Sequence, residues 1–279
     1  AMAFLAKGHT PGRGPYGEVI NKAIDLVVSV QQSNGLLISS KDRLGRMYGH
    51  GIATLMLSEV SGMVDADRQE KVDEALGKAL KLILAAQDIK KSGHHVGGWR
   101  YSPGSKDSDI SCSGWQLMSL RSARNNGAPV PKKAIDKAVK YVLGLQCKDG
   151  GFGYSAPSGS GLARTGTALL CLEICGRHGT KETIQAGDYI LKNMPKAFGR
   201  SGHFYYGLYY CSQGMFQLGG KHWSEWGRRM YELMIKIQRP DGSWPAGRGS
   251  AGRAGPCYAT AMSILAMSVS YRQLPIYQR

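Results

Sequence analysis

The chain has 279 residues and a formal net charge of +16, and 42% of its residues are hydrophobic. This hydrophobic content is ordinary for a folded globular protein and excludes a largely disordered chain. No run of about 18 apolar residues occurs, which excludes a transmembrane helix.

The positive charge fits several anionic partners, among them a membrane surface touched from outside and a phosphorylated ligand. Net charge is the single feature that would support a nucleic-acid partner, and no binding motif accompanies it. We therefore expect no nucleic-acid partner. The six cysteines include no Cys-x-x-Cys pair, which favours buried thiols over a metal site. No glycine-rich nucleotide loop or nucleophile elbow is present. We therefore expect neither a metal nor a cofactor.

The chain opens Ala1-Met2-Ala3, which is typical of an engineered start. We expect that a native N-terminal segment has been removed, so the sequence predicts no cellular compartment. No signal peptide is recognisable in the residues present.

Five similar units follow one another from this point. In each unit an amphipathic helix ends near a Gln or Asn, a glycine-rich turn with an aromatic residue follows, and a helix rich in small residues comes next. The units are expected at approximately 16–62, 66–127, 131–179, 182–220 and 223–272. Taking Gln32, Gln87, Gln146, Asn193 and Gln238 as equivalent positions, the spacing is about 45 to 60 residues, the period of a helical-hairpin repeat.

The two helices of a unit differ in character. The first has charges on one face, as in 73–81, and is expected to lie outside with one face in water. The second is almost free of charge, and a helix that is apolar all round is buried. The pattern predicts an all-α fold, an α/α toroid of about five to six helical hairpins forming a single domain over 1–279. An open solenoid is the competing architecture.

The turns carry a family resemblance. Gly97-Gly-Trp99, Asp149-Gly-Gly-Phe152 and Asp241-Gly-Ser-Trp244 each follow a helix that ends in Gln. In this the chain resembles the prenyltransferase and squalene-oxidase repeat family, which includes the squalene and oxidosqualene cyclases and the β subunits of protein prenyltransferases. The segments Gly97–Leu120, Tyr205–Gly220 and Tyr271–Tyr277 look like a single-domain bacterial branch of the planctomycete type. The resemblance implies an α/α barrel with a central apolar cavity for isoprenoid chains; a closed ring of this family has six hairpins.

Two carboxylates distinguish the second unit from the others. Class II cyclases of the family protonate their substrate with the central Asp of an Asp-x-Asp-Asp motif. Asp107-Ser108-Asp109-Ile110 keeps the first and central acids, whereas Ile110 replaces the last. The resemblance therefore makes Asp109 the candidate general acid, with Asp107 in support. The alternative is that Asp109 only caps the helix that follows.

The zinc chemistry of the protein prenyltransferases fits the sequence less well. Their zinc ligands are an Asp-x-Cys pair and a distant His in a Tyr-His segment. Here two residues separate Asp109 from Cys112, and Tyr206 stands where the His is expected, with His203 displaced. We expect no zinc site of this type.

The loops that lead into the inner helices must meet at one end of a toroid, and they are rich in Lys and Arg. This rim is expected to hold a phosphate or diphosphate head, with aromatic side chains behind it for an apolar tail. The ligand-binding candidates are Trp99, Arg100, Tyr101, Trp115, Arg164, Phe204, Tyr206, Arg248 and His50, the last of which begins an inner helix. The alternatives are a solvated basic face and aromatics that join one hairpin to the next.

Two functions remain open at this stage. The first is a terpenoid-cyclase-like or prenyltransferase-like toroid that holds an isoprenoid or other apolar chain, with cyclisation initiated by a proton from Asp109. The second is a non-catalytic module that binds a ligand or a protein.

Overall fold

The computed structural model describes residues 1–279 except 40–45, 196, 198–202, 248 and 279. Within these residues the regular secondary structure is helical, and β-structure is limited to isolated bridges at Gln31–Leu37 and Gln146–Phe152. The short helix α1 (Met2–Ala6) opens the chain. The outer helices are α2 (Gly17–Ser29), α4 (Ala66–Asp88), α6 (Lys132–Leu143), α8 (Lys181–Lys192) and α10 (Gly220–Ile237). The inner helices are α3 (Arg46–Val60), α5 (Ile110–Asn125), α7 (Leu162–Ile174), α9 (Phe204–Leu218) and α11 (Gly249–Met267).

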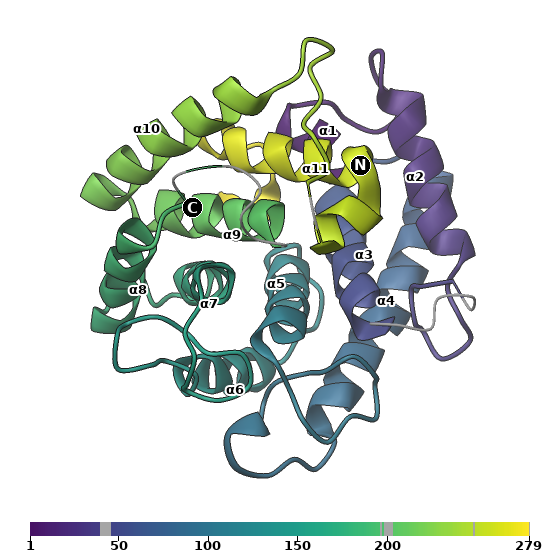
Figure 1. The fold of residues 1–279 in the computed structure, drawn as a ribbon. Helices are drawn as coiled ribbons and strands as arrows, with labels where there is room; N and C mark the ends of the chain where they lie inside the picture. The colour runs from purple at the N-terminus through teal and green to yellow at the C-terminus, as the bar shows by residue number, and fades with distance from the viewer. Residues whose placement is uncertain (40–45, 196, 198–202, 248, 279) are drawn as a thin grey trace.

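The inner helices form one layer and the outer helices surround it (Figure 1). Each inner helix packs against the next along the chain, from α3 through α5, α7 and α9 to α11. Helix α9 shows why this layer is buried, because apolar and small residues cover every side of it and almost all of them are inaccessible to water. The outer helices α2, α6, α8 and α10 are strongly amphipathic and bury one face. The predicted all-α toroid is confirmed.

A glutamine at the end of an outer helix joins consecutive hairpins. The side-chain amide of Gln87 donates to Gly97 O in its own turn at 3.0 Å and to Ala134 O of the next outer helix, α6, at 2.9 Å. Gln146 makes the same pair of contacts with Gly150 O and Glu182 O, and Gln31 makes them with Gly35 O and Ala75 O. The equivalent position in the first unit is therefore Gln31, one residue before the predicted Gln32.

The turn glycines allow this close approach. Gly35, Gly97 and Gly150 have positive φ angles of 90°, 94° and 83°. A Cβ at Gly97 would lie 2.4 Å from the carbonyl oxygen of Lys137, so any side chain there would push α6 away. The Gly-rich turn is thus the seat of the following outer helix, which explains its repetition.

The ring is open on one side. Helix α1 packs against α11, and a cavity lined by α1, α2, α3 and α11 separates α11 from α3. The described residues supply five hairpins, α2–α3 to α10–α11, and the short α1 lies against α11.

The C-terminal segment covers the end of the ring where the inner helices finish. It includes the 3-10 helices η2 (Val269–Tyr271) and η3 (Pro275–Tyr277). Tyr277 makes a hydroxyl–hydroxyl hydrogen bond with Tyr209 at 2.5 Å, and its carbonyl accepts from Gln217 Nε2 at 3.0 Å. Ile276 N donates to Glu59 Oε2 at 3.2 Å. No described helix is long and apolar enough to cross a membrane.

Candidate functional site

A cavity of about 630 Å³ opens at the end of the ring where the inner helices begin. Its position follows from the repeat, since every turn delivers an inner helix to this end. The third residues of α3, α7 and α9, namely Tyr48, Arg164 and Tyr206, all line it. We call it the mouth cavity; its other lining residues are Tyr101, Ser111, Tyr154, Ala163, His203, Ala251, Ala254 and Tyr258.

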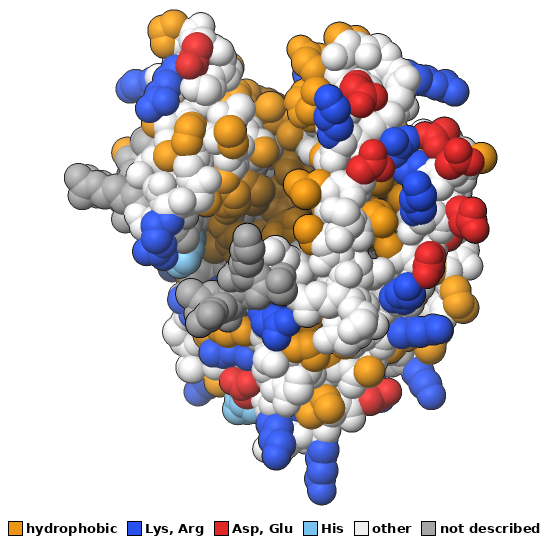
Figure 2. Space-filling view, turned by 90° about the vertical axis from the view of Figure 1, so that its right-hand side faces the viewer, with side chains coloured by type: hydrophobic (Ala, Val, Ile, Leu, Met, Phe, Trp, Pro, Cys, Tyr) orange, Lys and Arg blue, Asp and Glu red, His pale blue; other side chains and the backbone are white. Residues whose placement is uncertain are grey.

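A second cavity, of about 480 Å³, lies between α1, α2, α3 and α11. Tyr48, Tyr206 and Tyr258 line this apolar cavity as well as the mouth cavity, so the two meet at these three side chains. A hollow bordered by hydrophobic side chains is visible on this side of the molecule in Figure 2. The rest of the lining is Ala1, Met2, Ala3, Phe4, Ala23, Val27, Gly49, Ile52, Ala53, Leu55, Met56, Trp115, Tyr209, Ala261, Met262 and Leu265.

Stacked aromatic rings form one wall of the apolar cavity. The Trp115 indole lies parallel to the Tyr209 ring, with a centroid separation of 5.7 Å and an interplanar angle of 9°. Tyr210 meets Trp115 edge-on at 5.3 Å, and Tyr206 packs on Tyr210 at 4.7 Å. Such offset and edge-to-face pairs hold the rings in place and leave their faces as a rigid apolar surface.

Asp109 is fully buried at the N-terminus of α5. Its Oδ1 accepts from Cys112 N at 2.9 Å, so it is the N-cap of this helix. Its Oδ2 makes no hydrogen bond within the described part of the chain and lies 3.5 Å from Arg100 Nε. Burial raises the pKa of Asp109, and the Cys112 N–H and the Arg100 guanidinium oppose that shift. Asp109 therefore combines a capping contact with a carboxylate oxygen whose proton is held more firmly than in water.

Two tyrosines cover this ion pair. The Arg100 guanidinium lies 4.8 Å from the ring centroid of Tyr101 and 5.3 Å from that of Tyr154. The two tyrosine hydroxyls are hydrogen-bonded to each other. Both rings line the mouth cavity, whereas Arg100 and Asp109 do not. Tyr101 and Tyr154 thus separate Asp109 from the space where a ligand would lie.

Asp107 stands on the solvent side of the same arginine. Its Oδ2 lies 3.6 Å from Arg100 Nε, and about half of its side chain is exposed. The two carboxylates are therefore held by one guanidinium. Burial, and not a neighbouring negative charge, is the main cause of the raised pKa of Asp109.

The other predicted ligand residues lie in several different places. Trp99 is buried in its turn, where its indole N–H donates to Ile83 O at 2.8 Å. His50 accepts from Leu37 N at Nδ1 and contacts Ala79 O through Nε2, and burial lowers its pKa to about 4. Phe204 is buried against Tyr205. Arg248 lies outside the described residues.

The structure brings the remaining candidates together around the two cavities. Tyr101, Arg164 and Tyr206 line the mouth cavity, and Trp115 and Tyr206 line the apolar cavity. The Arg164 guanidinium donates to Gly159 O at 2.6 Å, which holds it in the loop at the rim.

Sequence reasoning did not single out Tyr48, Tyr154, His203 or Tyr258 as site residues. Tyr48 could have been found by its position, because it is the third residue of an inner helix, as Tyr206 is. Tyr258 has a related position, since it lies just after the kink at Gly255 in α11. Tyr154 carries no comparable signal, since a loop places it.

The described residues at this end of the ring include no cluster of metal-ligand side chains. Cys112 Sγ donates to Arg100 O at 3.0 Å. Among the described residues, no group of three His, Cys, Asp or Glu side chains is arranged to hold an ion.

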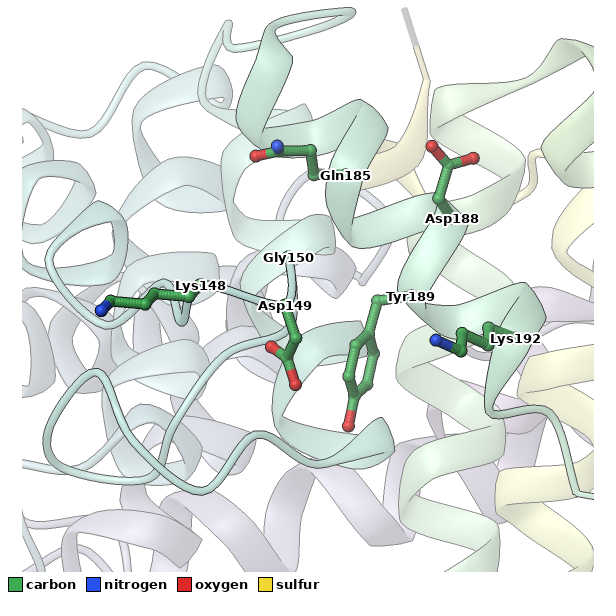
Figure 3. Close-up of a pocket in the computed structure, with 7 residues that line it drawn as sticks. All are labelled: Lys148, Asp149, Gly150, Gln185, Asp188, Tyr189 and Lys192. Carbon is green, nitrogen blue, oxygen red and sulfur yellow. The ribbon is translucent and has the colours of Figure 1, made fainter.

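A smaller pocket of about 220 Å³ lies at the surface, where the Asp149 turn meets α8 (Figure 3). Asp149 accepts from Gly151 N and from Ser160 Oγ, so its carboxylate serves the turn. A Cβ at Gly150 would lie 2.9 Å from Gln185 O. This pocket is the outer side of the contact that seats α8, and we assign it to architecture.

Known structures with the same fold include a terpene cyclase. No family model matches the sequence, and a search of curated proteins finds no relative. Two solved structures of substituted forms of MstE, a type II terpene cyclase from Scytonema, superpose on the chain with TM-scores of 0.64 and 0.60. Both are complexes with its substrate, geranylgeranyl dihydroxybenzoate. Sequence identity is 16% and 14%, and the match covers 92% and 91% of this chain and 76% of the cyclase in each case.

This similarity establishes the class of fold. The chain is a helical toroid of the kind seen in type II terpene cyclases, as the repeated turns predict. The low identity leaves ligand and chemistry to be argued from the site itself.

Proposed function

We propose that the chain binds an isoprenoid or similar long apolar molecule along the two joined cavities. The observation that carries this proposal is the apolar cavity of about 480 Å³, which is lined by aromatic, methionine and aliphatic side chains and is reached from the mouth past Tyr48, Tyr206 and Tyr258. Cavities of this size and lining bind apolar ligands by removing their surface from water. The isoprenoid-bearing substrate of MstE, which shares the fold, supports the same class of ligand.

The polar end of such a molecule is expected in the mouth cavity. Arg164 supplies a positive charge there, with His203 in the same lining. A guanidinium binds carboxylate or phosphate oxygens well because its N–H groups form a planar fork. We therefore propose an anionic head at Arg164 and an apolar tail between α3 and α11.

The proposed reaction is cyclisation initiated by a proton from Asp109. The carboxyl proton would pass to an alkene carbon of the bound chain, and the resulting carbocation would be attacked by a further double bond and finally lose a proton. Burial supports this role because it disfavours the carboxylate. The step requires Tyr154 and Tyr101 to move aside or to relay the proton, since they cover Asp109.

A turnover experiment tests this reaction. Wild type, Asp109→Asn and Asp107→Asn are each incubated with squalene and with geranylgeranyl dihydroxybenzoate, and the products are analysed by mass spectrometry. We expect cyclised product from wild type, a loss of at least about 100-fold in Asp109→Asn because a general acid contributes that much, and activity retained in Asp107→Asn. Equal activity in wild type and Asp109→Asn would remove Asp109 from the mechanism.

The second candidate function is a module that binds an apolar ligand without turning it over. The position of Asp109 favours it, since the carboxylate does not line either cavity and lies 3.5 Å from an arginine. Under this alternative the protein binds squalene and geranylgeranyl dihydroxybenzoate but yields no product in any variant. Arg164→Gln then lowers the affinity for the anionic geranylgeranyl dihydroxybenzoate and leaves the affinity for squalene unchanged.

A further inference from the structure

Among the described residues, the outward face of α11 lacks the outer helix that covers each of the other inner helices. The inner helices α3, α5, α7 and α9 pack against the next outer helices, α4, α6, α8 and α10 respectively. In the described part of the chain no outer helix follows α11, and the short α1 lies along one side of it. A groove of about 670 Å³ remains between them.

The floor of this groove is one helical stripe. Cys257, Thr260, Ala261 and Ile264 lie at helical spacing on α11 and face it. Phe4 of α1 forms an apolar wall, and the opposite wall is the turn that contains Asp241. An apolar floor with polar rims matches an amphipathic helix. Lys7, His9 and Arg239 stand on the rims.

The turn beside the groove has the geometry that seats an outer helix elsewhere. Gln238 Nε2 donates to Gly242 O at 2.9 Å, as Gln31, Gln87 and Gln146 do to their turn glycines. In those three turns the glutamine amide also donates to a backbone carbonyl of the next outer helix, that of Ala75, Ala134 or Glu182. The turn glycine lies against the carbonyl three residues further along the same helix, that of Lys78, Lys137 or Gln185.

The fourth copy of this seat is vacant among the described residues. Gly242 has the same positive φ, 81°, but a Cβ built there meets nothing within 4 Å. Gln238 is exposed, whereas Gln87 is buried. The side chain of Ile235 on the same helix is 64% exposed. The turn therefore has the backbone geometry of the other seats, but no helix among the described residues lies against it.

We propose that the groove between α1, α11 and the Asp241 turn is a docking site for an amphipathic α-helix of a partner polypeptide. The partner helix would present one backbone carbonyl to Gln238 and the carbonyl three residues later to Gly242, with its apolar face on Ile264 and Phe4. The interface would continue the arrangement by which α4, α6 and α8 are held.

The probe for this site is a capped peptide of residues 180–193, which contains α8 and is seated in the chain by the Gln146 turn. The readout is the alkylation rate of Cys257, a free and exposed thiol on the groove floor, with the modified site identified by mass spectrometry. We expect the peptide to slow alkylation of Cys257 at least about tenfold at saturation, since a docked helix removes the thiol from solvent. A scrambled peptide is expected to have no effect.

Two variants tie the protection to the seat. Gln238→Ala removes the donor and is expected to weaken peptide binding about fivefold, the value of one hydrogen bond. Gly242→Ala places a methyl group where the helix carbonyl would lie and is expected to abolish protection. Thermal unfolding of both variants confirms that they remain folded.

Three results would overturn the proposal. The peptide protects Cys257 equally in wild type and in both variants, or the peptide gives no protection at all. The third is protection of Cys257 without the peptide. Protection by a higher protein concentration alone would assign the groove to a second copy of the chain, and protection by farnesol but not by the peptide would assign it to a lipid.

Discussion

The surroundings of Asp109 favour a hydrogen-bond acceptor but disfavour a negative charge. The N-terminus of α5 needs an oxygen acceptor at this position, and the Cys112 N–H uses it. The buried surroundings disfavour the charge that a carboxylate brings. A side chain that keeps the acceptor and loses the charge therefore satisfies the helix as well as Asp109 does.

This reasoning predicts different outcomes for two substitutions. Asp109→Asn is expected to leave the free energy of unfolding unchanged or raised, because Asn is an equally good N-cap. Asp109→Ala is expected to lower it by about 1 kcal/mol through loss of the cap. Urea unfolding at neutral pH measures both. A large loss of stability in Asp109→Asn would show that the carboxylate charge itself holds this region together.

Glu59 is a second buried carboxylate, at the opposite end of the ring. It accepts from Ser122 Oγ at 2.5 Å and from Ile276 N at 3.2 Å, so it joins α3, α5 and the C-terminal segment. Burial raises its pKa to about 7, while these two hydrogen bonds oppose the shift. Because the folded-state pKa lies above the unfolded value, the protonated form is the one that stabilises the fold.

The expected pH dependence follows from that sign. The contribution of Glu59 is fully present below about pH 4.5, the ordinary value for Glu, and is lost as the pH rises through about 7. Glu59→Gln is expected to remove this dependence and to unfold at higher temperature than wild type at pH 8, by a few degrees. Thermal melts at pH 5 and pH 8 measure it. An unchanged difference between the two pH values in the variant would assign the dependence to other groups.

At the scale of elements, a glutamine at the end of α2, α4 and α6 joins each of these hairpins to the next, whereas Asn193 at the end of α8 donates to Tyr189 O of its own helix. Gln87 is buried and joins the second and third hairpins through two carbonyls, Gly97 O and Ala134 O. Gln238 occupies the equivalent place in the fifth hairpin, but it is exposed and makes one such contact. The same substitution at the two positions therefore isolates the contribution of the junction.

Gln87→Ala is expected to lower the free energy of unfolding by about 2–4 kcal/mol, because it removes two hydrogen bonds of a buried side chain and leaves Gly97 O without this donor. Gln238→Ala is the matched control and is expected to cost less than about 1 kcal/mol, because water can replace an exposed hydrogen bond. Chemical denaturation of the two variants side by side tests the comparison. Equal costs at the two positions would mean that the junction contributes no more than a helix-end contact.

At the scale of the whole molecule, the repeated pattern was sufficient to predict the inner and outer rings. A turn of the Asp-Gly-x-aromatic kind needs a residue that adopts a positive φ and lets another backbone come close. Glycine meets both needs, so the repeated glycines mark these turns in the sequence. The register of the first unit was one residue out because Gln31 and Gln32 are adjacent and both bond to the loop that follows.

The cavities could be predicted only in part. Arg164 was identified because the loops of the rim are rich in basic residues, and Trp115 and Tyr206 were identified because an aromatic lining is expected behind that rim. Tyr154 was not, because the loop that carries it is positioned by a tertiary contact, Ile110 N to Tyr154 O at 2.9 Å. Five recognisable units against the six hairpins of a closed ring allow an open ring, but the list of repeats does not say which helices would lack a neighbour.

The central claim is that the apolar cavity holds an isoprenoid chain. Native mass spectrometry of the protein incubated with geranylgeraniol tests it most directly, with Ala53→Phe as the variant, because Ala53 lines this cavity and not the mouth. We predict one bound lipid in wild type and affinity at least about tenfold lower in Ala53→Phe, since a phenyl ring would occupy the space of the chain. No binding to wild type, or equal binding to both proteins, would contradict the account.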